Sequence, residues 1–128
     1  MAESGPGFKR HPDHKIEIED AGHPVIVRVG EEEIARSGKA KILKEASYPP
    51  VYYIPLEDMP QSLLSDSEHS TYCPFKGTAR YWDLMTGNGM LDNAVWGYEQ
   101  PYQEVSSITG HVAFYPDRVI VEPCEQVG

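Results

Sequence analysis

The chain has 128 residues, the length of a single ordinary domain, and its 40% apolar and 24% charged residues are typical of a globular protein. Its net charge of −9 disfavours binding to nucleic acid and to anionic membrane surfaces, because both carry negative charge. No apolar run approaches the ~20 residues that a membrane-spanning helix needs, and the first residues lack the basic and apolar regions of a signal peptide, so we expect a cytoplasmic protein.

Residues 1–10 are small, polar or rich in proline and glycine, and we expect them to be flexible, with residues 11–128 forming one β domain. Apolar and polar residues then alternate with a period of two, which is the pattern of strands with two different faces. The segments expected in this half are strands at 16–19, 25–29, 33–37 and 51–54, turns at 21–24 and 30–32, and a helical turn within 56–64. The segment 40–46 is compatible with a strand or a short helix, and the prolines around 51–54 restrict that strand to a sheet edge or a strand end.

The second half begins with strands predicted at 75–85 and 90–98, joined by the tight turn Thr86-Gly87-Asn88-Gly89. A short helix is expected over 101–108, because Pro101 suits the first helical position. Two last strands are predicted at 111–115 and 119–121. The sequence therefore predicts a mainly β domain of antiparallel strands with one or two short helices.

The segment 71–82 contains the densest group of chemically reactive side chains. Cys73 and Lys76 stand three apart around Pro74, and a turn there would bring the ammonium near the sulfur, which lowers the pKa of a thiol. Gly77 would allow the backbone to approach a ligand closely. A buried cysteine beside an exposed lysine is the commoner explanation of this spacing. Cys73 and Lys76 are therefore candidate catalytic residues, although the Cys-x-x-Lys spacing that points to them is weakly specific.

We expect two or three members of a cluster of nine aromatic residues to line a pocket while the others fill the core. The nine are Tyr52, Tyr53, Tyr81, Trp82, Trp96, Tyr98, Tyr102, Phe114 and Tyr115. Trp82 and Trp96 stand at comparable distances from the 86–89 turn, which predicts that they are near neighbours across the two strands. The candidate ligand-binding residues are Tyr53, Thr71, Gly77, Trp82, Trp96 and Tyr98.

Metal and cofactor sites have little support in the sequence. Zinc takes imidazole and thiolate ligands, so His69, Cys73 and His111 could form a mixed site, but no compact spacing favours one. There is no glycine-rich phosphate loop, paired His-Glu zinc motif or dinucleotide fingerprint. We expect neither a metal nor another cofactor. The pairing of Cys73 with Cys124, the other cysteine, is left open.

Four blocks in the same order resemble the domain-of-unknown-function family numbered 427, and they are 49–55, 71–82, 94–101 and 108–115. The resemblance implies a compact fold related to the β-tent domains, in which two antiparallel sheets meet at an angle. Paired-cysteine zinc sites often pin that fold, and this chain would replace them with ordinary packing because it has no Cys-x-x-Cys pair. The family is sometimes labelled a nucleotidyltransferase, but no acidic metal pair or phosphate loop in this sequence supports that label.

Proteins related to the β-tent fold include B-type methionine sulfoxide reductases and the drug-binding domain of cereblon, which implies thiol chemistry or binding in an aromatic cage. Our first hypothesis is an aromatic-lined cleft that binds an unknown small molecule, with Cys73 and Lys76 as its polar groups. The alternative is an enzyme with Cys73 as nucleophile or redox centre and Lys76 stabilising its thiolate or an anionic substrate. A protein-interaction module is a further alternative, and the oligomeric state is left open. Binding ranks first because no general acid or base can be assigned beside Cys73.

Overall fold

The computed structural model describes residues 3–124. Its elements in chain order are α1 (Gly7–Arg10), β1 (Ile16–Asp20), β2 (Val25–Val29), β3 (Glu32–Ser37), β4 (Lys41–Glu45), β5 (Val51–Pro55), η1 (Leu56–Asp58), η2 (Gln61–Leu63), β6 (Leu64–Cys73), β7 (Gly77–Thr86), β8 (Gly89–Gly97), η3 (Gln103–Ile108), β9 (His111–Phe114) and β10 (Ile120–Pro123), where η marks a 3-10 helix. Among the described residues, no helix has the length and apolar character needed to cross a membrane.

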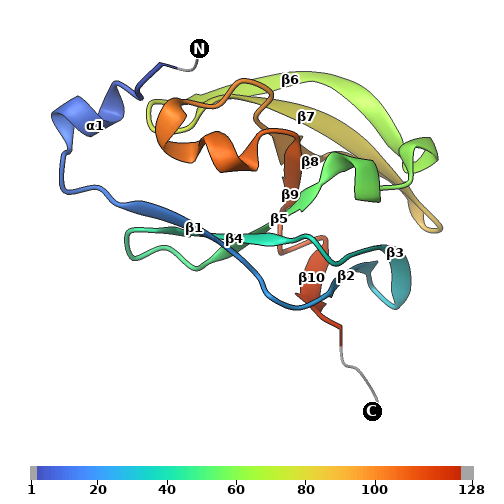
Figure 1. Ribbon diagram of the computed structural model, residues 1–128. Helices are drawn as coiled ribbons and strands as arrows, with labels where there is room; N and C mark the ends of the chain where they lie inside the picture. Colours follow the sequence, from blue (N-terminus) through green and yellow to red (C-terminus); the bar gives the residue numbers. More distant parts are fainter. Residues whose placement is uncertain (1–2, 125–128) are drawn as a thin grey trace.

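The described strands form two antiparallel sheets, which confirms the predicted mainly β fold (Figure 1). The larger sheet has the order β1-β4-β5-β9-β8-β7-β6, and the smaller one has the order β10-β2-β3. The larger sheet is narrowest where β5 meets β9, because only Ile54 with Val112 and Pro55 with His111 pair there. It therefore consists of two arms, β1-β4-β5 and β9-β8-β7-β6, joined at the end of β5.

Two hydrophobic cores lie on opposite faces of the long β7-β8 hairpin. We call the first the valine core; it joins the smaller sheet to the hairpin and includes Val25, Val27, Ile54, Trp82, Leu84, Val95, Val112 and Val119. The second, the tyrosine core, fills the space between the two arms and includes Leu43, Tyr53, Ala79, Tyr81, Tyr98, Val105, Ile108 and Ala113. Strand alternation explains this division, because successive residues point to opposite faces.

The strands differ from the prediction in their pairing, position and number. The turn at 21–24 does not close a hairpin, because β1 pairs with β4 while β2 pairs with β3 and β10. The segment 40–46 contains strand β4. Strand β5 lies between β4 and β9, so it is an interior strand, and its terminal Pro55 marks the strand end that the prolines predict. Strand β6 was not predicted at all.

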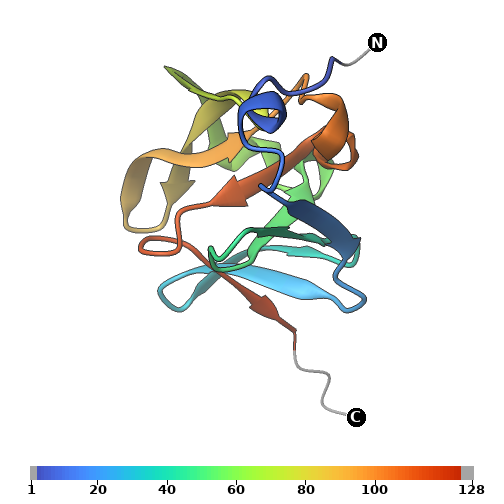
Figure 2. The ribbon, with the colours of Figure 1, turned by 90° about the vertical axis from the view of Figure 1, so that its left-hand side faces the viewer.

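The N-terminal segment packs against the turn that follows β6. The backbone N–H of Gly7 donates a hydrogen bond to the Pro74 carbonyl at 2.9 Å. The Phe8 ring meets the Phe75 ring edge-on, with 5.1 Å between their centroids. Helix α1 and strand β10 lie at opposite ends of the molecule (Figures 1 and 2). The end that carries α1 therefore also carries the 73–76 turn.

Candidate functional site

Five of the predicted site residues come together on the tyrosine core. Thr71 and Cys73 are two apart on β6 and so share a face of that strand. Trp96 lies on β8 and Tyr98 follows the last residue of that strand, and both side chains pack in the tyrosine core. The Thr71 hydroxyl lies 3.0 Å from that of Tyr81, which is the register partner of Trp96.

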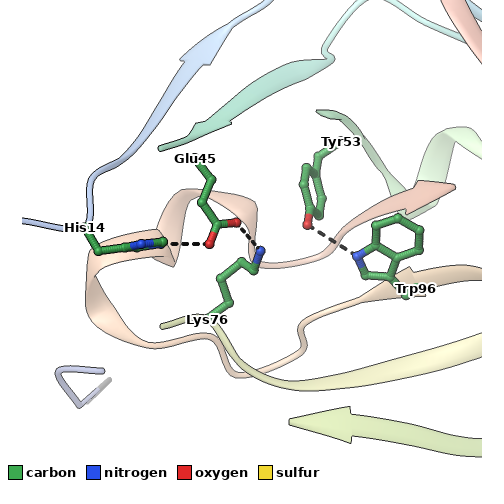
Figure 3. A network of polar contacts seen from close by, with 5 residues as sticks. All are labelled: His14, Glu45, Tyr53, Lys76 and Trp96. Carbon is green, nitrogen blue, oxygen red and sulfur yellow. Dashed lines mark hydrogen bonds and ion pairs between the residues drawn. The ribbon is translucent and has the colours of Figure 1, made fainter. Parts of the chain in front are cut away.

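Tyr53 joins the group from β5. The indole Nε1 of Trp96 donates a hydrogen bond to the Tyr53 hydroxyl at 3.3 Å (Figure 3). The structure thus brings together Tyr53, Thr71, Trp96 and Tyr98, and Cys73 lies close enough for its charge to act on Tyr53 and Tyr98.

Trp82 lies on the opposite face of the β7-β8 hairpin from Trp96. The prediction that the two indoles are near neighbours across the strands is therefore wrong. The register pairs Trp82 with Val95, so its side chain points away from the face that carries Trp96. Trp82 is 5% exposed within the valine core, and the Arg80 guanidinium lies 4.6 Å from its ring centroid. Trp82 therefore does not belong to the group around Cys73.

A carboxylate that the sequence did not indicate lies at the end of the tyrosine core. Glu45, the last residue of β4, accepts a hydrogen bond from the Lys76 ammonium at 2.7 Å and contacts the His14 Nε2 at 2.8 Å (Figure 3). The three side chains are only 14–17% exposed. The Lys76 amine is thus engaged with Glu45, whereas the sequence placed it beside the Cys73 sulfur.

Both Glu45 and His14 reach Lys76 through the non-local pairing of β1 with β4. Ile16 is the register partner of Glu45, so the segment just before β1 lies beside the end of β4. The His14 ring also stacks on the Phe75 ring at a centroid distance of 3.9 Å. This stacking ties the carboxylate cluster to the turn that contains Cys73 and Lys76.

Burial and charge set the protonation states in this region. Burial alone would raise the pKa of Glu45, but the hydrogen bonds and charges of Lys76 and His14 outweigh it and hold that pKa below its ordinary value. Burial raises the pKa of Tyr53 and of Tyr98, and negative charge on Glu45 or Cys73 adds to both shifts. The two phenols therefore stay neutral at physiological pH, and their hydroxyls can donate hydrogen bonds.

The Tyr98 hydroxyl has an unusual environment. The residue is 6% exposed, and its hydroxyl makes no hydrogen bond to any described residue. Within residues 3–124, no fully buried side-chain nitrogen or oxygen lacks a partner, so the Tyr98 oxygen itself must retain contact with solvent. The phenol is thus a nearly buried ring with one accessible polar atom, close enough to Cys73 to be affected by its charge.

Gly77 is required by the backbone. Its φ of +114° lies in the region that favours glycine, and a Cβ there would contact the Gln100 carbonyl oxygen at 3.4 Å. The neighbouring Lys76 carbonyl accepts a hydrogen bond from the Tyr102 N–H at 3.1 Å. Because Gly77 is the register partner of Cys73, this conformation fixes the start of the strand beside the thiol.

The other cysteine and the histidines lie elsewhere. Cys124 follows β10, and its Sγ is 3.5 Å from the Arg36 Nη1 on β3, so the two cysteines belong to different sheets. His69 packs on the Tyr81 ring, and His111 hydrogen bonds the Thr109 carbonyl. In the part of the chain that the structure describes, no three His, Cys, Asp or Glu side chains are placed to hold a metal ion.

Two small hollows touch the predicted aromatic residues, and they are separate. One of about 200 Å³ is lined by Trp82, Tyr98 and His111, among others. The other, of about 130 Å³, is lined by Tyr52, Trp96 and neighbouring residues. Neither hollow is lined by Cys73 or Lys76. A single aromatic-lined cleft that contains the thiol and the amine stays a prediction.

The family comparison agrees with the resemblance seen in the sequence. A family model described as "Domain of unknown function (DUF427)" matches residues 17–125. The chain belongs to this family. The match includes Glu45, Cys73, Lys76 and Tyr98, whereas His14 lies before it. No curated protein matches the sequence. The DUF427 domain described here therefore takes its functional interpretation from its own geometry.

Proposed function

We propose that this DUF427 domain binds a small molecule beside the Tyr98 hydroxyl, with Cys73 and Lys76 as further polar groups and Tyr53 and Trp96 as an aromatic wall. The observation that supports this most strongly is the Tyr98 phenol, which is nearly buried, has no hydrogen-bond partner among residues 3–124 and keeps its oxygen in contact with solvent. Polar atoms so enclosed are normally hydrogen-bonded, so a ligand atom is a suitable partner. We also propose a cytoplasmic location, where Cys73 stays a thiol.

The chemistry of these groups favours a ligand with an oxygen acceptor, such as a carbonyl or carboxylate. Tyr98 stays protonated because burial raises its pKa, so it can donate its hydrogen. The Lys76 ammonium has three N–H donors, and Glu45 takes one of them. A flat apolar part of the ligand would pack against Trp96, which is partly exposed. Thr71 would act indirectly by holding the Tyr81 hydroxyl.

The test uses Cys73 as a reporter in a Cys124→Ser background. A panel of small aromatic carboxylates, amides and ketones is screened by ligand-observed NMR, and each hit is then tested for slowing the alkylation of Cys73 by iodoacetamide. Replacing Tyr98 by Phe should weaken these hits about threefold to tenfold, the value of one hydrogen bond. The matched control is Tyr48→Phe, because Tyr48 is exposed and lines neither of the two small hollows. The proposal is contradicted if the hits bind the Tyr98→Phe variant as tightly as the parent protein, or if the screen finds no hits.

A second candidate function is catalysis by the Cys73 thiol. Two observations favour it. Cys73 is partly exposed, and it lies close enough to Tyr53 and Tyr98 for a negative charge on its sulfur to raise the pKa of both phenols. An activated thiol reacts as the thiolate at neutral pH. Alkylation followed by mass spectrometry across a pH range would then show Cys73 reacting much faster than free cysteine at pH 7. A rate no faster than that of free cysteine rejects the enzyme and leaves the binding proposal in place.

A further inference from the structure

Two adjoining hollows on the Trp82 side of the β7-β8 hairpin have different chemical characters. The smaller, of about 200 Å³, has apolar walls formed by Leu56, Trp82 and Val112. The larger, of about 700 Å³, extends toward the start of β4. Both are lined by the segment 109–111, so they meet at the loop that leads into β9. The two hollows therefore adjoin at this loop, and we call the smaller one the apolar end and the larger one the polar end.

The polar end carries two pairs of opposite charges. The Lys41 ammonium lies 3.7 Å from the Asp20 carboxylate, and the Lys39 ammonium lies 3.9 Å from the Glu57 carboxylate. Both separations exceed the length of a good hydrogen bond, so the ammonium hydrogens and carboxylate lone pairs stay available. A ligand with one positive and one negative group would complement this arrangement better than a simple anion or cation.

His111 adds a defined acceptor between the two ends. Its Nδ1 lies 3.0 Å from the Thr109 carbonyl oxygen, which can only accept a hydrogen bond. The proton of the neutral ring is therefore on Nδ1, and Nε2 presents a lone pair. This nitrogen makes no hydrogen bond to the described residues. A ligand ammonium group is a suitable donor to it.

We propose that the two hollows together bind a free apolar α-amino acid, such as leucine or phenylalanine. The side chain of the amino acid would occupy the apolar end beside Trp82. This hollow of about 200 Å³ is smaller than the roughly 300–1,000 Å³ of sites for drug-sized ligands, so it suits a small apolar group. The α-carboxylate would bind Lys41, and the α-ammonium would bind Glu57 and the His111 Nε2. Tyr98 also lines the apolar end, but the site excludes the thiol and the amine of the proposed function, because neither Cys73 nor Lys76 lines either hollow.

The first test is a titration of the full chain followed by two-dimensional ¹H–¹⁵N NMR. L-phenylalanine or L-leucine should shift the amide signals of Gly110 and His111 with saturation, and leave that of Cys73 in place. Three probes each lack one recognised group: 2-phenylethylamine has no carboxylate, 3-phenylpropionate has no ammonium and L-serine has no apolar side chain. Each should bind about tenfold more weakly or worse, as expected for the loss of one charge-assisted hydrogen bond or the apolar contact. Equal binding of all probes, or no saturable shift with either amino acid, overturns the proposal.

The second test separates specific contacts from general charge. Lys41→Gln and Glu57→Gln should each weaken amino acid binding about fivefold or more. The matched controls are Lys44→Gln and Glu19→Gln, which change the net charge equally but break an ion pair of 2.6 Å outside both hollows. The control variants should bind like the parent protein. If they lose as much affinity as the cavity variants, the assignment of this site is overturned.

Discussion

Replacing Lys76 by Met should cost the domain a large part of its stability, although Lys76 is a charged residue in a turn. The change keeps the length of the side chain and removes the ammonium that lies 2.7 Å from Glu45. The Glu45 carboxylate, whose side chain is only 14% exposed, would then keep a single partner, His14. A partly buried carboxylate that loses a cation is costly because it cannot be fully rehydrated.

The magnitude follows from the burial and from the remaining bond. Removing one partner of a fully buried ion pair costs about 3–5 kcal/mol. The contact with the His14 Nε2 at 2.8 Å still stabilises Glu45, and some solvent reaches the carboxylate. We therefore expect a loss of about 2 kcal/mol in the free energy of unfolding, or about 6–8 °C in Tm for a domain of this size.

Urea unfolding at pH 7, followed by tryptophan fluorescence, measures this loss. The matched control is Lys44→Met, because Lys44 and its partner Glu19 are about half exposed and such pairs contribute at most about 1 kcal/mol. The double variant with Lys76→Met and Glu45→Gln should recover part of the stability, since it no longer leaves a charge without its partner. The reasoning is refuted if Lys76→Met costs no more than Lys44→Met.

The same pair predicts how the loss depends on pH. The pKa of Glu45 in the folded protein lies below its ordinary value of 4.5, because Lys76 and His14 outweigh the effect of burial. A lowered folded pKa contributes stability that is present above about pH 4.5 and is lost as the pH falls through the folded value. The difference between the parent protein and Lys76→Met should therefore shrink as the protein is acidified below pH 4.5.

Two further pairs of variants test the packing. Gly97→Ala should cost about 1–3 kcal/mol in thermal unfolding, because its Cβ would lie 2.7 Å from the His111 carbonyl oxygen. The control Gly38→Ala should be neutral or slightly stabilising, because a Cβ there meets no atom within 4 Å. Tyr98→Phe should change the free energy of unfolding by less than about 0.5 kcal/mol, since the Tyr98 hydroxyl makes no hydrogen bond to a described residue. Tyr53→Phe should cost about 1 kcal/mol, because it removes the oxygen that accepts the hydrogen bond of the Trp96 indole N–H. The opposite order of the two tyrosine variants would contradict our account of the site.

The fold could be predicted where the local sequence determines the structure. Alternation in 25–29 and the Thr86–Gly89 turn signal correctly indicated strands β2, β7 and β8. Strand β6 escaped prediction because Leu64–Cys73 is an edge strand of mostly exposed polar residues, whose sequence carries no apolar period. The pairing of β1 with β4 escaped because it joins distant segments, and local patterns do not specify such contacts.

The same limit applies to the site. The Cys73–Lys76 segment was identified correctly as a place where reactive side chains gather, because its residues are adjacent in sequence. Glu45 was missed because it is 31 positions from both His14 and Lys76. An acidic residue at the end of a strand normally faces solvent. Only the tertiary pairing of β1 with β4 turns this one into a largely buried ion-pair partner.

The position of Trp82, in contrast, could have been derived by counting. A two-residue turn at Gly87 and Asn88 makes Thr86 the partner of Gly89, so partners across the hairpin always have one even and one odd number. The irregularity between Trp82 and Leu84 shifts the register by two residues and preserves this rule. Trp82 and Trp96 both have even numbers, so their side chains must lie on opposite faces of the hairpin. This parity places the two indoles on different faces of the hairpin. Because Cys73 does not line the hollow beside Trp82, a ligand bound there should leave the alkylation of Cys73 unchanged.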